Sequence, residues 1–256
     1  MVHGLEKFKE YFEDHTNQYV FIGGTACDIL MGELGVPFRA TKDLDIVLII
    51  EKLDISFGEI FWKFIEDVGY EHHEKSTGEN QFYRFSKPNR SEYPAMIELF
   101  SRKSDDFNLK FETGLTPIHL DESIISLSAI LLNDVYYDSL MRSMQTIDGY
   151  SVIEIETMIL FKIKAWLDLK ERFERGEHVD SKNIKKHKND IFRLLTNVVP
   201  SKRVEIAREI EEDIKIFIEK INVDKPDLKY LEITNASVYD LLEILKNLYT
   251  IKHEEI

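Results

Sequence analysis

Residues 19–50 of this 256-residue chain read Y-V-F-I-G-G-T-A-C-D-I-L-M-G-E-L-G-V-P-F-R-A-T-K-D-L-D-I-V-L-I-I. The apolar run 19–22 stops at Gly23 and Gly24, which is typical of a buried strand that ends in a tight turn. Apolar residues then recur at helical spacing over 26–34, so we expect a helix with Gly24 or Thr25 at its N-terminus. This stretch therefore predicts a strand, a turn and a helix in immediate succession.

The turn at Gly23, Gly24 and Thr25 has a chemical interpretation as well as a structural one. Glycine lets backbone N–H groups approach a phosphate closely, and a helix N-terminus adds a partial positive charge. A Gly-Gly pair is also common in turns that bind nothing. The phosphate-binding interpretation of this turn therefore depends on the residues that lie beside it.

Asp43 and Asp45 introduce a second apolar run, residues 44–50, which is rich in Ile and Val and predicts another strand. Residues two apart on a strand point to the same face, so both carboxylates share one side while Leu44 points into the core. Two acids held side by side repel each other, and a bound cation stabilises such a pair. The alternative is two acids at a solvent-exposed strand start.

Glu98 is the single charge in the apolar segment Met96-Ile97-Glu98-Leu99-Phe100. Glutamate is rarely buried without a partner, so this residue marks either a sheet edge that faces water or a site. If Glu98 lies beside Asp43 and Asp45, the three carboxylates form a hard oxygen site suited to Mg²⁺.

The predicted secondary structure changes from mixed strands and helices to helices alone near residue 150. Strands predicted over 82–86 and 95–101 should pair antiparallel, and the apolar segment 123–132 fits either a strand or a helix. Further helices are predicted over residues 5–18, 55–68, 153–173, 181–195, 201–221 and 238–250. We therefore expect an α+β domain at 1–150, with a mixed sheet and flanking helices, and an all-helical domain at 151–256.

Charge is distributed unevenly along the chain, which has a net charge of −14. Residues 1–150 contribute −12 and residues 209–256 contribute −6, whereas residues 151–208 contribute +4. So acidic a chain is unsuited to general nucleic-acid binding, and the basic stretch is the place to look for an anionic partner. The alternative is a solvated helix face.

Taken in order, these motifs resemble the polymerase-β-like nucleotidyltransferase superfamily, and within it the AbiEii-type family of toxin–antitoxin and abortive-infection systems. The string R-x-T-x-D-x-D matches Arg39, Thr41, Asp43 and Asp45. In the helical half, F-K-I-K-A-W at 161–166 and I-K-K-H-K-N-D-I at 184–191 resemble the family's helix lysine and its later K-x-x-D-I element. The third acid here is Glu98 where the family more often has Asp.

The resemblance implies a role for each matched residue. Asp43, Asp45 and Glu98 would hold Mg²⁺ or Mn²⁺, and Glu98 could also accept the proton of the attacking hydroxyl. The cradle of the nucleoside triphosphate would consist of Gly23, Gly24, Thr25, Arg39, Thr41 and Lys164. Asp190 would orient Lys164 or the nucleotide, and Lys162, two residues away, is expected to point elsewhere.

The acceptor stays open at this stage. The resemblance implies an RNA, such as a tRNA 3′ end, or a protein hydroxyl, and an antitoxin protein as partner. One alternative is a small-molecule enzyme of the aminoglycoside-modifying kind, since the acidic N-terminal half suits a cationic sugar. Another is a non-catalytic nucleotide-binding or interaction module.

The cellular compartment is also an expectation from the sequence. Cys27 is the single cysteine, which excludes an intrachain disulfide framework and fits a reducing cytoplasm. We see no secretory signal and no apolar stretch near the roughly 20 residues that span a bilayer, so no membrane partner is expected.

Overall fold

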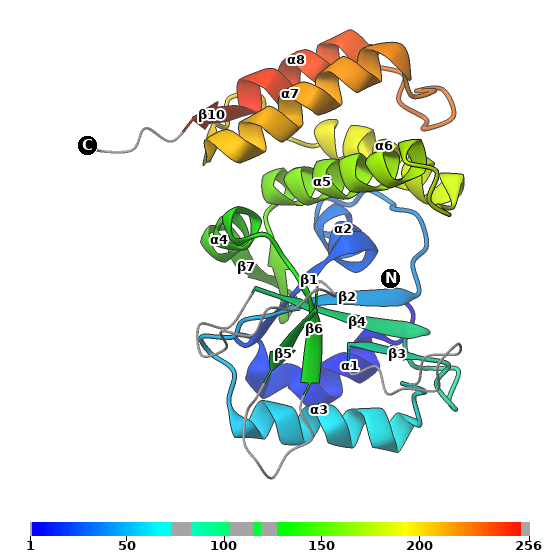
Figure 1. The fold of residues 1–256 in the computed structure, drawn as a ribbon, viewed down its shortest axis with the longest axis vertical. Coiled ribbons are helices and arrows are strands. Elements are labelled where there is room, and N and C mark those ends of the chain that lie inside the picture. Colours follow the sequence, from blue (N-terminus) through cyan, green and yellow to red (C-terminus); the bar gives the residue numbers. More distant parts are fainter. Residues whose placement is uncertain (1, 73–82, 103–114, 119–126, 252–256) are drawn as a thin grey trace, which may run out of the picture. The chain divides into compact units, whose positions relative to one another are not determined.

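The computed structural model describes residues 2–72, 83–102, 115–118 and 127–251. Figure 1 shows the chain, which divides into two compact units, Met1–Glu154 and Ile155–Ile256. The first unit extends past the predicted boundary at 150 because strand β8 (Tyr150–Ile153) pairs with the sheet of that unit. Sequence periodicity assigns residues 151–153 to the helical half, since the short segment Ser151-Val152-Ile153 before a helix does not reveal a distant strand partner.

A mixed sheet forms the centre of the first unit. In the described residues it has eight strands in the order β5-β6-β4-β2-β1-β8-β7, and β3 pairs with β4 beside this path. Strands β2, β4 and β6 run parallel, whereas β1 and β2 are antiparallel. Besides β8, the strands are β1 (Tyr19–Ile22), β2 (Asp43–Leu48), β3 (Arg84–Ser86), β4 (Met96–Ser101), β5 (Leu115–Ile118), β6 (Leu127–Leu131) and β7 (Met144–Ile147).

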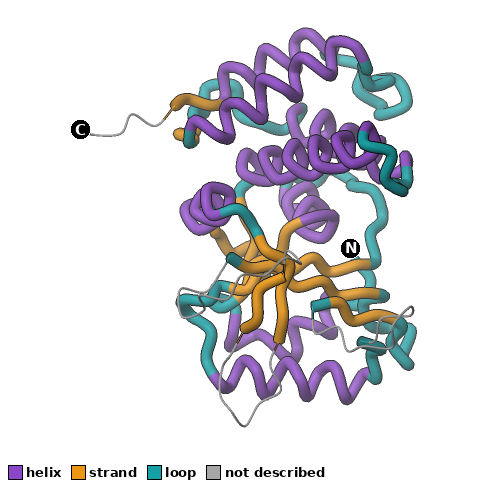
Figure 2. The backbone as a smooth tube through the Cα atoms, viewed as in Figure 1, coloured by secondary structure: helices purple, strands orange, loops and turns teal. Residues whose placement is uncertain are grey.

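Helices cover both faces of this sheet (Figures 1 and 2). One face carries α1 (Leu5–Phe12) and α3 (Ile55–Val68), and the opposite face carries α2 (Gly23–Glu33). A short 3₁₀ helix (Glu13–His15) follows α1, and α4 (Asp134–Arg142) connects β6 to β7.

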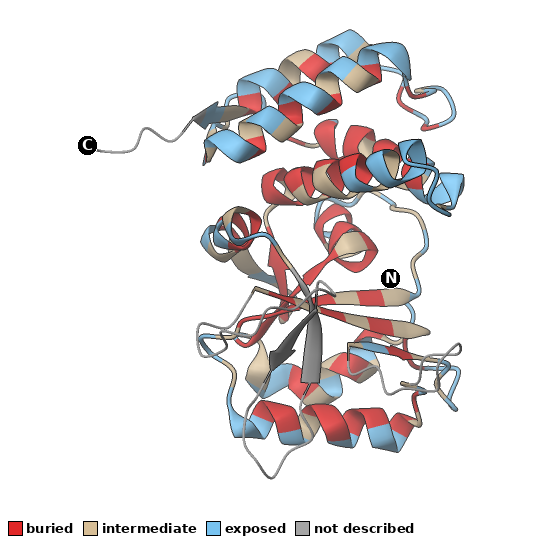
Figure 3. Cartoon of the chain, viewed as in Figure 1, coloured by how far each residue is buried: buried red, intermediate tan, exposed pale blue. Residues whose placement is uncertain are grey.

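The face under α1 and α3 is packed with aromatic residues. Both helices show alternating buried and exposed residues in Figure 3. Members of this cluster are Phe8, Phe12, Tyr19, Phe21, Phe57, Phe61, Phe64 and Phe85. Local signals fix the ends of α3: the Asp54 side chain accepts a hydrogen bond from the backbone N–H of Phe57, and Gly69 ends the helix at φ 72°. This side of the sheet is therefore covered by a closely packed aromatic core.

The second unit consists mainly of helices α5 (Ile155–Glu174), α6 (Ser181–Leu195), α7 (Arg208–Val223) and α8 (Val238–Leu248). It is not all-helical as predicted, because β9 (Val204–Ile206) and β10 (Tyr249–Ile251) form a two-stranded parallel sheet. These short segments are rich in Val, Ile and Thr, and they adopt the extended conformation because they pair with each other across about 45 residues of sequence.

The mixed sheet with flanking helices, and the antiparallel pairing of β3 with β4, confirm the predicted α+β class. The ambiguous segment 123–132 contains strand β6, and its residues 123–126 lie outside the described part of the chain. Within the described ranges, each helix is too short or too polar to cross a membrane.

Candidate active site

Asp45 lies against the glycine turn. The antiparallel register of β1 and β2 places Ile22 opposite Asp45, so Gly23, the next residue, meets the Asp45 side chain. Gly23 has φ 66°, a conformation that L side chains rarely adopt, and helix α2 begins there rather than at Gly24 or Thr25. A Cβ at Gly23 would come within 2.8 Å of Asp45 Cγ and would collide with its Oδ2. Glycine is therefore required here by the backbone and by the carboxylate.

The Arg39 and Thr41 side chains approach the same turn. A Cβ at Gly24 would lie 2.7 Å from Thr41 Oγ1 and 3.4 Å from Arg39 Nη2. The Thr25 hydroxyl donates to the backbone carbonyl of Asp43 at 2.8 Å, which ties the first turn of α2 to the start of β2. The structure thus brings the predicted nucleotide-binding residues of the first unit, from Gly23 to Thr41, to one place beside Asp43 and Asp45.

Asp43, Asp45 and Glu98 share one face of the sheet. In the parallel pairing of β2 with β4, Asp45 is the direct register partner of Glu98. Leu44 and Ile97, which alternate with the acids, are fully buried and point to the other face. All three carboxylates are only partly exposed. The predicted shared face is confirmed, whereas a metal-binding role for the three acids stays a prediction.

Arg84 is a member of this site that the sequence analysis did not identify. It is the register partner of Glu98 in the antiparallel pairing of β3 with β4. Its Nε donates to Glu98 Oε1 at 2.6 Å, and its Nη2 lies 2.5 Å from the same oxygen. The predicted antiparallel pair of strands was the available signal, but strand register is not readable from a sequence with an undetermined loop between the strands.

The three acids are not assembled as a metal site in this arrangement of side chains. Among the described residues, no three His, Cys, Asp or Glu side chains are grouped so that they could hold a metal ion. Backbone placement nevertheless fits a divalent cation, because hard carboxylate oxygens share one face and Gly23 leaves room for Asp45 beside the turn. In this arrangement the Glu98 carboxylate forms an ion pair with the Arg84 guanidinium.

We expect Gly23→Ala to destabilise the first unit by at least about 1–2 kcal/mol, because a left-handed backbone conformation costs an L residue about that much. The collision with Asp45 adds to this cost and displaces the carboxylate. Thermal or urea unfolding of the full chain measures the change.

Gly32→Ala is the matched control, since Gly32 belongs to the same helix and a Cβ there meets nothing within 4 Å. That substitution should stabilise the protein by up to about 1 kcal/mol through helix propensity. Equal effects of the two substitutions would contradict the conformational requirement at Gly23.

In the second unit, Lys162 and Asp190 form a buried ion pair, with Nζ of Lys162 3.0 Å from Oδ2 of Asp190. Their side chains are 3% and 0% exposed, so this pair joins α5 to α6 inside the unit. Asp190 is thus paired with Lys162 and not with the predicted Lys164, which lies about 200° away around the helix axis. The alternative prediction, that Asp190 orients the nucleotide, stays a prediction. Lys162 therefore faces α6, and Lys164 faces another direction.

Lys164 faces α7, where its Nζ lies 3.3 Å from Asp213 Oδ2. The same Nζ lies 3.7 Å from Oδ1 of Asp168, which is one turn further along α5. Burial alone would lower the pKa of Lys164, but the charges of Asp168 and Asp213 raise it above its ordinary value. Burial raises the pKa of Asp168, with Lys164 opposing and Asp213 reinforcing that shift. Lys164 is consequently a protonated cation at neutral pH, and a third of its side chain is exposed.

The basic stretch is partly neutralised by its own unit. Lys188 is largely buried and lies 2.7 Å from Asp224 Oδ1, so it anchors α6 to the end of α7. The Lys185 ammonium lies 4.8 Å from the centroid of the Tyr230 ring, a cation–π contact at the surface. Of these two lysines, Lys185 is exposed and Lys188 is buried.

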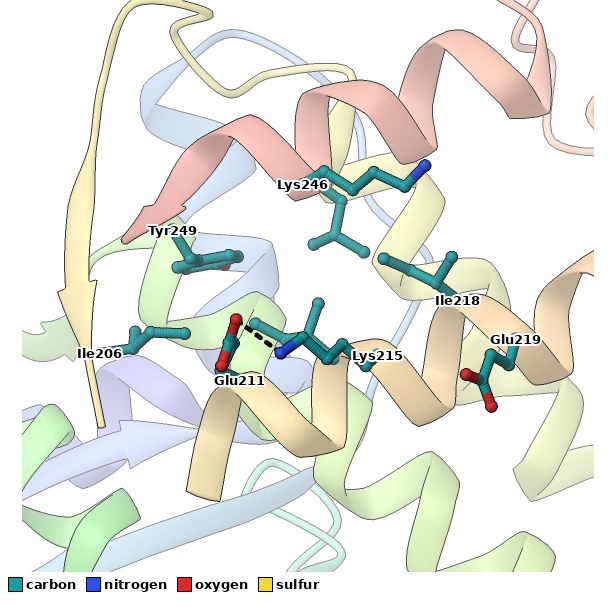
Figure 4. A pocket seen from close by; sticks show the side chains of 9 residues that line it. Ile206, Glu211, Lys215, Ile218, Glu219, Lys246 and Tyr249 are labelled. Carbon is teal, nitrogen blue, oxygen red and sulfur yellow. Dashed lines mark ion pairs between the residues drawn. The ribbon is translucent and has the colours of Figure 1, made fainter. Parts of the chain in front are cut away.

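A pocket of about 380 Å³ in the second unit contains none of the predicted site residues (Figure 4). Its lining is mostly apolar, with an ion pair of 2.7 Å between Lys215 and Glu211 at one wall. The lining residues are Ile206, Glu211, Ile214, Lys215, Ile218, Glu219, Leu245, Lys246 and Tyr249.

Comparison with known proteins gives weak likenesses. No protein-family model and no curated protein matches the chain. The crystal structure of JHP933 from Helicobacter pylori is 14% identical, with a TM-score of 0.34 and coverage of 95% of this chain and 88% of that chain. The crystal structure of a "putative nucleotidyltransferase" from H. pylori is 16% identical, with a TM-score of 0.33 and coverage of 95% and 89%. Likenesses at this level leave the function to be inferred from the residues themselves.

Proposed function

We propose that this chain is a Mg²⁺-dependent nucleotidyltransferase of the polymerase-β-like type, which transfers a nucleoside monophosphate from a nucleoside triphosphate to a hydroxyl acceptor. The observation that carries this proposal is the placement of Asp45. Its carboxylate occupies the space that a side chain at Gly23 would fill, and its register partner on the next strand is Glu98. A glycine turn of the kind that binds phosphate and a set of carboxylates on one sheet face thus occur together in one unit.

The residues of the first unit supply binding and proton transfer. The α2 N-terminus has no side-chain cap, so its first backbone N–H groups, from Gly24 and Thr25, are suited to phosphate oxygens. Arg39 adds positive charge beside them. Asp43, Asp45 and Glu98 would hold Mg²⁺, which when bound stabilises charge on the attacking and leaving oxygens.

The proposed reaction is an in-line displacement at the α-phosphorus. The acceptor hydroxyl oxygen forms a bond to phosphorus, the bond to the bridging oxygen breaks, and pyrophosphate leaves. Glu98 accepts the hydroxyl proton, which requires its carboxylate to be released from Arg84.

For the acceptor we propose an RNA, such as a tRNA 3′ end, or a protein hydroxyl, with the chain acting as the toxin of a toxin–antitoxin pair. The +4 charge of residues 151–208 favours an anionic acceptor, although Lys188 is engaged within its own unit. A cationic sugar is the second candidate, favoured by the −12 charge of residues 1–150. A non-catalytic module has no need to keep the repelling pair Asp43 and Asp45.

The test is to incubate the purified protein with each α-labelled nucleoside triphosphate, Mg²⁺ and one acceptor class at a time: total RNA, cell protein, or aminoglycosides. Label transferred to one class, and abolished by a chelator, would support the proposal and identify the acceptor. Absence of transfer with all four nucleotides and all three classes would favour the non-catalytic alternative.

Lys164→Ala should lower transfer about 10²–10³-fold, the loss typical of one donor that stabilises developing charge. Lys162 is committed to Asp190, so Lys164 is the better candidate of the two for a phosphate contact. Single-turnover rates with a labelled nucleotide measure the effect.

Lys215→Ala is the matched control, because it also removes an ion-paired lysine from the second unit. Its turnover should equal that of the unmodified protein. An unchanged rate in Lys164→Ala would remove this residue from the site.

A further inference from the structure

We infer that Arg84 is a positioning residue whose guanidinium pairs with the Glu98 carboxylate in the absence of metal. The guanidinium then competes with a divalent cation for that carboxylate. The inference rests on the proposed function, since it takes Glu98 as a metal ligand. It adds a residue and a form of control that the sequence motifs do not contain. Binding of metal at Glu98 then requires displacement of a guanidinium.

The contact itself is specific. Two guanidinium nitrogens of Arg84, Nε and Nη2, both approach a single oxygen of Glu98, at 2.6 Å and 2.5 Å. Charge-assisted hydrogen bonds of this kind are stronger than neutral ones. The Glu98 side chain is 15% exposed, so water screens the pair less than it would a fully exposed pair.

The fold puts Arg84 on the face of the acids. Phe85, the next residue, is fully buried, and its ring packs 5.3 Å from that of Phe61 on α3. Side chains alternate along a strand, so Arg84 must point to the opposite face, where Glu98 and Asp45 lie in register. Arg84, Glu98 and Asp45 therefore form one row across three neighbouring strands.

The ion pair between Arg84 and Glu98 can also dissociate without disturbing the packing around it. Almost half of the Arg84 side chain is exposed, at 47%, so the guanidinium can turn into solvent without leaving a cavity. A divalent cation and the guanidinium cannot both occupy the same Glu98 oxygen, and their like charges repel. Removal of the Arg84 charge should therefore strengthen metal binding, in contrast to the loss expected at a ligand.

The experiment is a Mn²⁺ titration of the full chain without nucleotide, in which electron paramagnetic resonance reports the free ion. Arg84→Gln should lower the dissociation constant for Mn²⁺ about tenfold, the order of magnitude expected when one partly screened charge next to the cation is removed. Arg84→Lys keeps the charge and should remain near the unmodified protein. Lys63→Gln on α3 removes one charge behind the sheet and should change nothing.

A double-mutant cycle tests whether the effect passes through Glu98. In a Glu98→Gln background, Arg84→Gln should no longer tighten Mn²⁺ binding, because the shared oxygen has lost its charge. An undiminished effect in that background, or unchanged affinity in Arg84→Gln alone, would overturn the inference.

Asp45→Asn separates this inference from the proposed function. Mn²⁺ binding that weakens in Asp45→Asn but is indifferent to Arg84→Gln would overturn the role of Arg84 and leave the metal site standing. Mn²⁺ binding that is indifferent to Asp45→Asn would overturn the metal site, and the Arg84 inference with it.

Discussion

Asp45→Asn is expected to abolish nucleotidyl transfer, with a loss of at least about 10³-fold, which exceeds the usual loss for a single neutral donor. The Asp45 carboxylate lies between the Gly23 turn, where we propose that the phosphates bind, and Glu98, a proposed metal ligand. Loss of its charge should therefore affect both nucleotide binding and metal binding. The substitution is nearly isosteric, so the packing around Gly23 is kept. Transfer of labelled nucleotide measures the loss.

The same variant should unfold at an equal or higher temperature in the absence of metal. One charge fewer beside Asp43 relieves repulsion on the shared strand face. Stabilisation by added Mg²⁺, which follows mass action on a folded-state site, should disappear. Asp138→Asn, an exposed acid on α4, loses the same charge and should retain both activity and the response to metal.

Retained transfer in Asp45→Asn would refute the proposed mechanism. A variant that loses activity and is also strongly destabilised would point instead to a structural role for this carboxylate. Melting temperature and transfer rate must therefore be measured on the same preparation.

Lys162→Met is expected to lower the free energy of unfolding of the second unit by about 3–5 kcal/mol, the range found when one partner of a buried ion pair is removed. The substitution leaves the Asp190 carboxylate buried without its 3.0 Å partner. Arg193, 4.0 Å from the other Asp190 oxygen, compensates in part and favours the lower end of the range. Trp166 is buried on the same helix, and in a Trp62→Phe background it reports unfolding of this unit by fluorescence.

The double variant Lys162→Met/Asp190→Leu should recover most of that loss, because apolar replacement of both partners of a buried pair is often neutral or stabilising. Lys164→Met, two residues along the helix, should cost at most about 1 kcal/mol, since its ion pairs are partly exposed. Equal losses at Lys162 and Lys164 would contradict the assignment of the buried pair.

The sequence alone predicts the local part of the site. The turn at Gly23 follows from two glycines after an apolar run, and the shared face of Asp43 and Asp45 follows from the two-residue period of a strand. Glu98 is recognisable because a single charge interrupts an apolar segment. These features depend on neighbours in the chain, so local patterns are sufficient to predict them.

Only the tertiary structure decides which distant residues meet. The pairing of Asp45 with Glu98 and of Glu98 with Arg84 depends on strand order and register, which are set by packing of whole faces rather than by local sequence. For the same reason β8 belongs to the first unit and β9 pairs with β10. Helical periodicity separates Lys162 from Lys164 by about 200°, but the sequence does not say which of the two directions meets Asp190. That choice is made by the packing of α5 against α6, which buries one lysine and leaves the other partly exposed.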